Sequence, residues 1–278
     1  MITCQLSGGL GNQLFQVFTT LAYSIQYNIS VMFEYTNETT EYITAEGIKM
    51  RHTYWNTFFI HIINLTTYSL PQNSLIDIVS FFPYKEPHFH YAPLPKEIST
   101  RNMKLVGYYQ SYKYFHEKKK YIFKLLKIQK LQEMVQKIYE IDTNSVAMHF
   151  RLGDYQYHES VHPILNLDYY KKALDSIVKK RGNCKVLYFC EEDISLQINI
   201  LKEEFANCIF TKIDDTISDW EQLLLMSCCR DNIIANSTFS WWGAYLGNQE
   251  DRIVCYPKKW FSDDKITRDM FLPTWDGV

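Results

Sequence analysis

The sequence predicts an α/β fold whose C-terminal half is a doubly wound parallel sheet. The chain opens with a strand, a glycine loop and a helix, and from about residue 143 five short apolar runs alternate with helical stretches. Buried parallel strands read as continuous apolar runs, and their alternation with helices is typical of a parallel sheet covered on both faces.

The N-terminal half begins with one βαβ unit. The predicted elements are a strand at residues 2–6, a helix up to about residue 27 and a second strand at residues 29–34. Residues 35–100 are rich in Thr, Asn, Pro and aromatic residues and have no clear period, so we expect loops and short helices there.

A single helix is predicted over residues 117–140. Its apolar positions recur every three or four residues, with lysines between them: Tyr121, Leu125, Ile128, Leu131, Val135 and Ile138. We expect the lysine-rich face to be solvated, and the alternative is a role at a membrane surface.

The C-terminal half alternates regularly. Strands are predicted at 145–150, 185–190, 208–213, 232–236 and 252–256, and helices near 168–180, 194–205, 217–229 and 238–247. We place a domain boundary near residue 140, which gives the expected domains 1–140 and 141–278.

Composition narrows the class of protein. A length of 278 residues with 46% hydrophobic content suffices for two domains, and a net charge of −2 gives no general electrostatic case for nucleic acid. The seven cysteines form no C-x-x-C pair, so neither a zinc site nor a disulfide framework is indicated. Since neither a signal peptide nor a membrane-spanning run is visible, we expect a cytoplasmic protein. No pattern indicates its oligomeric state.

The glycine loop is the first candidate site. Gly8, Gly9 and Gly11 follow a predicted strand and precede a helix, an arrangement that can hold a phosphate. The dinucleotide fingerprint is incomplete, because Leu14 stands where its third glycine belongs. A tight βα turn without a ligand is the alternative.

A second candidate begins at the end of the predicted strand 145–150. Alternation places His149 and Arg151 on the same side of an extended chain. Arginine is permanently charged and can hold a phosphate through two parallel hydrogen bonds. Asp154 follows, either as a general base or as an ion-pair partner of Arg151, and the ion pair is favoured by these residues alone.

The third candidate follows the predicted strand 232–236. Ser237 or Thr238 is a plausible helix N-cap, and hydroxyl and backbone N–H groups there suit a phosphate. Trp241 and Trp242 could line a cleft, but packing against the sheet is favoured for them.

An acidic stretch follows the predicted strand 185–190. Glu191 and Asp193 loosely imitate the acidic triplet by which many glycosyltransferases hold a divalent metal. A solvated loop or a helix cap is the favoured interpretation of these acids.

Taken together, the motifs are more specific than any one of them. GGLGNQLFQ stands near the start, GYYQSYKYF and HFRLGDY in the middle, and IIANSTFSWWGAYL and YPKKWF near the end. In this order they resemble the α-1,2-fucosyltransferases of glycosyltransferase family 11, over nearly the whole chain.

The resemblance implies a GT-B-like fold of two Rossmann-like halves facing a cleft. It also implies an inverting transfer from GDP-β-L-fucose to a galactose-ended glycan, with neither a metal nor another cofactor. The C-terminal half would hold the donor, with Arg151 on the diphosphate and His149 near the guanosine. The remaining residues that it implies are Ser237, Thr238, Phe239 and Ser240 around the phosphates, and Asn12 with Gly9 and Gly11 closing over the donor from the N-terminal half.

Three departures from the family pattern affect the expected site. Leu152 replaces a second arginine, so one cationic contact is lost. The usual F-S-D-D segment appears as Phe189-Cys190-Glu191-Glu192-Asp193, which leaves open which acid contacts the guanine, and Asp193 is kept as a candidate for donor binding. Asp231 stands where a histidine is common.

Two alternatives to fucosyl transfer stay open on the sequence. One is a different nucleotide-sugar transferase that depends on a metal held by Glu191 and Asp193. The other is a non-catalytic glycan-binding module on the same fold. Arg151 and the loop 236–240 argue against the module, because a lectin does not need to grip a diphosphate.

Overall fold

The structure is a computed structural model that describes the whole chain except residues 45–46, 72–73, 75, 97–100, 153–160 and 264. The chain divides into two compact units. The first unit comprises Met1–Gln129 and Ile266–Leu272, and the second comprises Lys130–Lys265 and Pro273–Val278.

The second unit is built on a six-stranded parallel sheet. Its strands are β6 (Val146–His149), β7 (Lys185–Phe189), β8 (Ile209–Lys212), β9 (Asp231–Ile233), β10 (Val254–Tyr256) and β11 (Asp276–Gly277). Their order across the sheet is β11-β10-β9-β6-β7-β8, and every neighbouring pair is parallel. The first strand therefore lies in the middle and the chain winds outward in both directions, which confirms the predicted doubly wound sheet.

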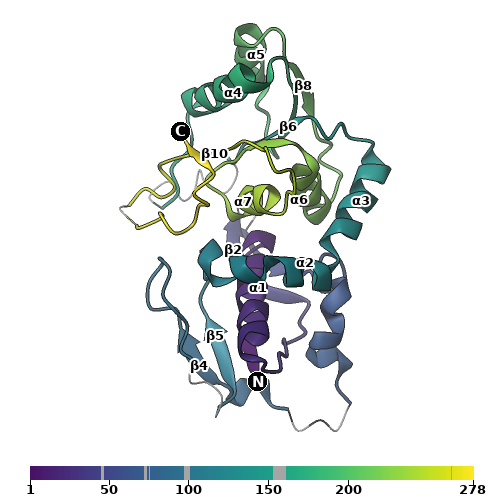
Figure 1. Cartoon of the computed structure of the whole chain (residues 1–278), viewed down its shortest axis with the longest axis vertical. Coiled ribbons are helices and arrows are strands. Elements are labelled where there is room, and N and C mark those ends of the chain that lie inside the picture. Colours follow the sequence, from purple (N-terminus) through teal and green to yellow (C-terminus); the bar gives the residue numbers. More distant parts are fainter. Residues whose placement is uncertain (45–46, 72–73, 75, 97–100, 153–160, 264) are drawn as a thin grey trace. The chain divides into compact units, whose positions relative to one another are not determined.

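Helices cover both faces of this sheet. They are α4 (Leu167–Arg181), α5 (Ser195–Glu204), α6 (Asp219–Cys228) and α7 (Thr238–Tyr245). Figure 1 shows α4 and α5 on one side of the strands and α6 and α7 on the other. Asn166 caps the start of α4 by accepting a hydrogen bond from the Tyr169 N–H, and Gly182 ends that helix with a φ of 76°.

The first unit contains a smaller parallel sheet. Its strands β1 (Ile2–Cys4), β5 (Met103–Val106) and β4 (Phe82–Lys85) lie in the order β1-β5-β4. The helix α1 (Leu10–Tyr27) follows β1, and its side chains are buried along most of its length. This confirms the predicted opening of strand, glycine loop and helix.

The second strand that we predicted, at residues 29–34, is wrong. The segment forms only two single bridges, from Val31 to Ile2 and from Phe33 to Thr66. The Met32 N–H binds the Ile2 carbonyl, whereas the next N–H, of Phe33, binds the Leu65 carbonyl. The segment changes partner from one residue to the next, so no continuous ladder forms.

The expectation of loops and short helices for residues 35–100 is confirmed only in part. Short 3-10 helices occur at Ile60–Leu65, Thr67–Ser69 and Ile78–Ser80. An antiparallel hairpin of β2 (Glu38–Thr44) and β3 (Gly47–His52) was not expected, and neither was β4. The register of the hairpin shifts between Glu38 and Glu41. Such an irregularity breaks the alternation on which strand prediction relies.

The single helix predicted over residues 117–140 is also wrong. After 3-10 turns at Tyr112–Tyr114 and His116–Lys118, the chain forms α2 (Lys119–Leu126) and α3 (Ile128–Tyr139). Between them Lys127 adopts a left-handed conformation with a φ of 52°. In α2 the buried residues are Ile122 and Leu126.

Candidate active site

The two strongest motifs of the second unit meet at one point of the sheet. The strand β6 pairs with β9, and the connections that leave these two strands run in opposite directions along the sheet. Ligands of open α/β sheets bind at the carboxyl ends of the strands at such a switch point. His149 is the last residue of β6, and α7 begins five residues after the end of β9.

His149 is buried at this edge. Its side chain lies beside that of Phe239, with 5.6 Å between the ring centroids, and the residue is 6% exposed. Burial, together with the smaller effect of the neighbouring Arg151 charge, lowers the pKa of His149 to about 3. Within the described part of the chain, its Nδ1 atom has no hydrogen-bond partner. The imidazole is therefore neutral at physiological pH and can only donate or accept hydrogen bonds.

Arg151 provides a fixed positive charge at the same edge. Its side chain is 21% exposed, and its Nη1 atom lies 3.9 Å from a carboxylate oxygen of Glu191, which follows β7. That carboxylate is 80% exposed, and ion pairs of this kind contribute little to stability. Asp154, the predicted base or ion-pair partner, lies outside the described residues.

The start of α7 orients the third motif. The Ser237 hydroxyl accepts a hydrogen bond from the Phe239 N–H at 3.3 Å, which confirms it as the N-cap. The Ser240 hydroxyl is buried and donates to backbone carbonyls of the same loop. Thr238 and Phe239 are half-buried, so of the four predicted residues they present the most surface. The N–H groups of a first helical turn lack partners within the helix and suit a phosphate.

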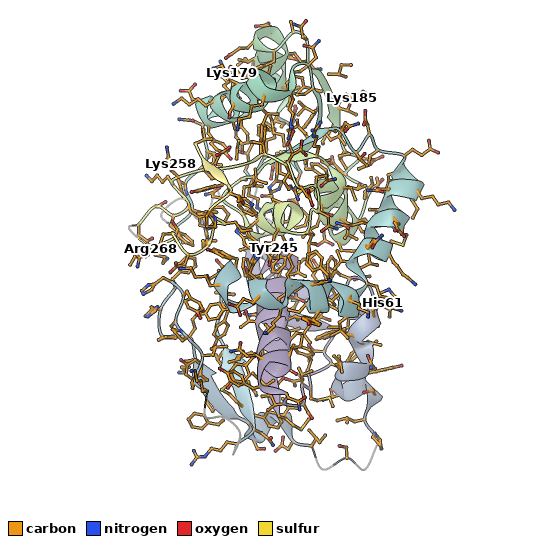
Figure 2. The ribbon with its side chains drawn as sticks, in the orientation of Figure 1. His61, Lys179, Lys185, Tyr245, Lys258 and Arg268 are labelled. Atoms are coloured by element: carbon orange, nitrogen blue, oxygen red, sulfur yellow. The ribbon has the colours of Figure 1, made fainter. Side chains whose placement is uncertain are left out.

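The residues around this loop are structural. The Asn236 amide donates to the carbonyls of Pro163 and Trp260, at 2.9 and 3.2 Å. Trp241 and Trp242 are fully buried, which confirms the packing interpretation. Tyr245, labelled in Figure 2 at the end of α7, stacks on Trp241 with 4.9 Å between centroids.

The acidic residues after β7 point to different partners. Glu191 pairs with Arg151, whereas Asp193 accepts a hydrogen bond from the Ser195 N–H at 2.9 Å, just before α5. That hydrogen bond lowers the pKa of Asp193. Among the residues that the structure describes, no group of three or more His, Cys, Asp or Glu side chains could hold a metal ion.

Asp231 lies at the amino end of β9, away from the carboxyl ends of the strands where His149 lies. It begins β9, is 1% exposed, and accepts hydrogen bonds from the Arg181 guanidinium at 3.0 and 3.1 Å. It also accepts a hydrogen bond from the Ile253 N–H at 2.6 Å. This departure from the family pattern therefore holds β9, β10 and α4 together rather than altering the switch point.

The glycine loop of the first unit holds Asn12 in place. Gly8 has a φ of 73°, and a Cβ atom added to it would lie 2.4 Å from the Asn12 Nδ2 atom. Gly9 caps α1 without a side-chain hydrogen bond. The Gln13 amide ties the loop to the hairpin by donating to the carbonyls of Gly8 and His52, at 3.0 and 2.8 Å. Glycine at position 8 is thus required by both its backbone conformation and its neighbour.

Gln110 is a site residue that reasoning from the sequence missed. Its Nε2 atom donates to the Asn12 Oδ1 atom at 2.9 Å, which directs the Asn12 NH₂ group away from it. The turn before it is strained, because Tyr109 has a φ of 54°. The Glu86 carboxylate holds this turn by accepting hydrogen bonds from the N–H groups of Tyr108 and Tyr109, at 2.8 and 3.0 Å. Gln110 lies within the motif GYYQSYKYF, but the motif does not indicate that Asn12 is its hydrogen-bond partner.

Arg51 is a second residue that was missed. Its Nη1 atom lies 4.0 Å from the position of a Cβ atom on Gly9. The residue is on β3, within the region that has no readable period, so only the folded hairpin brings it to the glycine loop.

Two curated proteins of Escherichia coli are similar in sequence. The Alpha-1,2-colitosyltransferase is 27% identical over 280 residues, which cover 96% of this chain and 94% of that protein. The O-antigen biosynthesis glycosyltransferase WbnK is 35% identical over 143 residues. This second alignment covers 47% of the chain and 45% of WbnK, so it spans about half of each.

One solved structure has a similar fold over its full length. It is POFUT1 in complex with GDP-fucose, with a TM-score of 0.55 and 9% identity, covering 92% of this chain and 97% of that one. At this identity the likeness concerns the fold alone, and it confirms the GT-B-like α/β architecture. None of the described helices is both long and apolar enough to span a bilayer.

The sequence profile of Glycosyl transferase family 11 matches residues 1–278, from one end of the chain to the other. Three features of the chain agree with this match: the order of its motifs, the doubly wound sheet of its second unit and its similarity to the colitosyltransferase over almost the full length. The chain is therefore a glycosyltransferase that belongs to glycosyl transferase family 11.

Proposed function

We propose that the chain transfers L-fucose from GDP-β-L-fucose to O2 of a galactose-type acceptor, with inversion and without a metal ion. Family membership supports the reaction type, and the full-length relative is named for an α-1,2 transfer. The observation that carries the proposal is the meeting of His149, Arg151 and the start of α7 at the switch point of the second unit.

Arg151 is assigned the stabilisation of the leaving group. Glycosyl transfer passes through an oxocarbenium-like state, by analogy with glycoside hydrolysis, while negative charge develops on the departing GDP. The guanidinium and the N–H groups at the start of α7 would face that charge. Hydrogen-bond donors that the fold already holds in position stabilise such a charge more effectively than water does, because they do not have to reorient during the reaction.

His149 is assigned to the guanosine end of the donor. Because its pKa is about 3, the imidazole is uncharged and would neither add to nor compete with the charge of Arg151. Its buried Nδ1 atom is available for a hydrogen bond to a ligand. Thr238 and Phe239 are both half-buried. Phe239 offers an apolar ring face beside His149, and Thr238 offers a hydroxyl group.

Asn12 is assigned an orienting role. An amide can donate and accept hydrogen bonds but cannot act as a base at neutral pH. Its contact with Gln110 selects one orientation of the amide, and its NH₂ group would then donate to a substrate. Gly9 caps α1, and Gly11 lies in the first turn of that helix, directly before Asn12.

The attacking hydroxyl of the acceptor needs a proton acceptor, and Asp154 is the candidate. The test is the variant Asp154→Asn, which keeps the shape but removes the base. Transfer should fall by about 10²–10⁴, the usual contribution of general base catalysis, while GDP binding is retained. Near-full activity would eliminate Asp154 as the base.

The donor is tested by calorimetry on the purified full chain. We expect GDP-fucose and GDP to bind with or without EDTA, and UDP-galactose and NAD not to bind. Binding of a UDP-sugar only in the presence of a divalent metal would overturn the proposal and would implicate Glu191 and Asp193. Binding of glycans with no nucleotide binding would favour a glycan-binding module.

A second donor is favoured by the full-length relative, which is a colitosyltransferase. Colitose is fucose without its 3-hydroxyl group. A site that hydrogen-bonds this hydroxyl should reject the deoxy sugar by about 10⁴–10⁵ in kcat/KM, whereas an apolar site discriminates by only about 10². Comparing kcat/KM for GDP-fucose and GDP-colitose therefore distinguishes the two donors.

A further inference from the structure

The helix α2 carries a concentration of positive charge that the proposed reaction does not use. Residues 117–127 contain five lysines and one glutamate, a net charge of +4. The whole chain has a net charge of −2, so all other residues together carry −6. A basic segment on an otherwise acidic protein creates a local positive field.

The inner face of α2 is fully occupied. Ile122 and Leu126 are completely buried, and the Phe123 ring meets the Phe18 ring of α1 edge-on, with 6.2 Å between centroids. Lys119 lies over the Phe123 ring, with its Nζ atom 4.8 Å from the centroid. Figure 1 shows α2 lying across α1. These contacts hold the helix in one rotation about its axis.

The outer face combines lysines with exposed apolar side chains. Lys120, Lys124 and Lys127 are exposed, and no ion pair within the described part of the chain includes them. Tyr121 is 64% exposed and Leu125 39% exposed. We call these five residues the basic face of α2.

The spacing makes the basic face a continuous surface. Tyr121 and Leu125 are four residues apart, as are Lys120 and Lys124, so each pair forms a stripe along the helix and the two stripes are adjacent. Lysines near a helix C-terminus are favoured by the helix dipole, which accounts for Lys124 and Lys127. The dipole accounts for neither Lys120 nor the exposed Tyr121 and Leu125.

We propose that the basic face of α2 binds the anionic headgroups of a membrane surface. Three lysine side chains would reach lipid phosphates, Tyr121 would lie at the boundary between headgroups and acyl chains, and Leu125 would enter the apolar side. An aliphatic side chain beside lysines favours a lipid surface over a purely ionic partner such as an acidic polysaccharide. The proposal does not depend on the identity of the donor sugar.

The test is co-sedimentation of the full chain with vesicles. We expect binding to mixed phosphatidylcholine and phosphatidylglycerol vesicles and little binding to phosphatidylcholine alone, with loss of binding at about 0.5 M salt. The combined variant Lys120→Gln, Lys124→Gln, Lys127→Gln should bind about 10²-fold more weakly, at roughly fivefold per lysine. Tyr121→Gln with Leu125→Gln should weaken binding at every salt concentration.

A matched control removes the same charge elsewhere. Lys85, Lys172 and Lys202 are exposed lysines that take part in no ion pair among the described residues, and their triple change to Gln should leave vesicle binding unchanged or slightly reduced. Thermal unfolding of each variant shows that it is folded. Equal binding to both kinds of vesicle, unchanged binding of the α2 triple variant, or binding to heparin without binding to vesicles would overturn the proposal.

Discussion

At the scale of single residues, Arg151 combines permanent charge with a position at the carboxyl edge of β6 and β9. We predict that Arg151→Ala lowers kcat/KM for sugar transfer by about 10²–10³, the usual cost of losing one donor to developing negative charge. Arg151→Lys should recover part of this loss, because lysine keeps the charge but not the paired donors. Steady-state kinetics on folded variants measure both.

The control for Arg151 is its ion-pair partner. Glu191 is 80% exposed, so Glu191→Gln should change kcat/KM by less than about fivefold. If Glu191→Gln is as damaging as Arg151→Ala, then the pair itself and not the cation carries the activity. If Arg151→Ala keeps the turnover and the GDP affinity of the wild type, the assignment of Arg151 to the diphosphate is wrong.

The low pKa of His149 predicts how the stability of the folded chain depends on pH. Its pKa is about 3 in the folded chain against 6.5 ordinarily, so below 6.5 the unfolded chain binds a proton that the folded chain does not. Folding stability therefore falls as the pH drops from 6.5 toward 3. Between about pH 7 and pH 5, His149 should account for a loss of roughly 2 kcal/mol.

The measurement for His149 is urea unfolding at both pH values for the wild type and His149→Gln. Since glutamine does not titrate, the variant should lose about 2 kcal/mol less than the wild type over this range. Equal losses in the two proteins would mean that the imidazole is protonated in the folded chain.

At the scale of elements, the break between α2 and α3 contradicts the single helix that was predicted over residues 117–140. A continuous helix would have placed Tyr121 and Leu125 in the core, whereas the left-handed Lys127 ends α2 and leaves them exposed. The Lys127 N–H binds the carbonyls of Lys124 and Phe123, which closes the helix end.

Lys127 itself provides the test of this break. A left-handed conformation costs a residue with a Cβ atom about 1–2 kcal/mol, so Lys127→Gly should raise the free energy of unfolding by about 1 kcal/mol. Lys124→Gly, inside α2, should lower it by about 1 kcal/mol. Urea denaturation distinguishes the two variants. A loss of stability in both would indicate a continuous helix.

The elements also differ in how well their sequences predict them. In the second unit, strands β6–β10 start or end within a few residues of the predicted ranges, because each is a short run rich in apolar residues, and every residue of β6 and β9 is buried. In the first unit, the segment 29–34 forms single bridges to partners distant in the chain, which a local pattern cannot encode. The hairpin β2–β3 pairs neighbouring segments, but its shifted register breaks the alternation of side chains.

At the scale of the whole molecule, a donor that binds only the folded chain must stabilise it. We predict that GDP at about 100 times its Kd raises the free energy of unfolding by roughly 2.7 kcal/mol. UDP at the same concentration should have no effect. Thermal unfolding with each nucleotide is the measurement, and equal stabilisation by both would contradict a guanine-selective site.

The cysteines illustrate what composition alone can predict for the molecule. All seven are buried free thiols, and their sequence spacing contains no C-x-x-C pair. Burial raises the pKa of several of their thiols, for example that of Cys4 to about 12, so these side chains behave as small apolar groups.

The sequence by itself determined the family, the parallel sheet of the second unit and the residues at its switch point. These follow from contiguous signals: apolar runs, a glycine loop and ordered motifs. The tertiary structure alone decided that Gln110 orients Asn12, that Arg51 approaches the glycine loop, and that Glu191 pairs with Arg151. Each of these contacts joins residues separated by at least 40 positions, and such pairs are brought together only by packing.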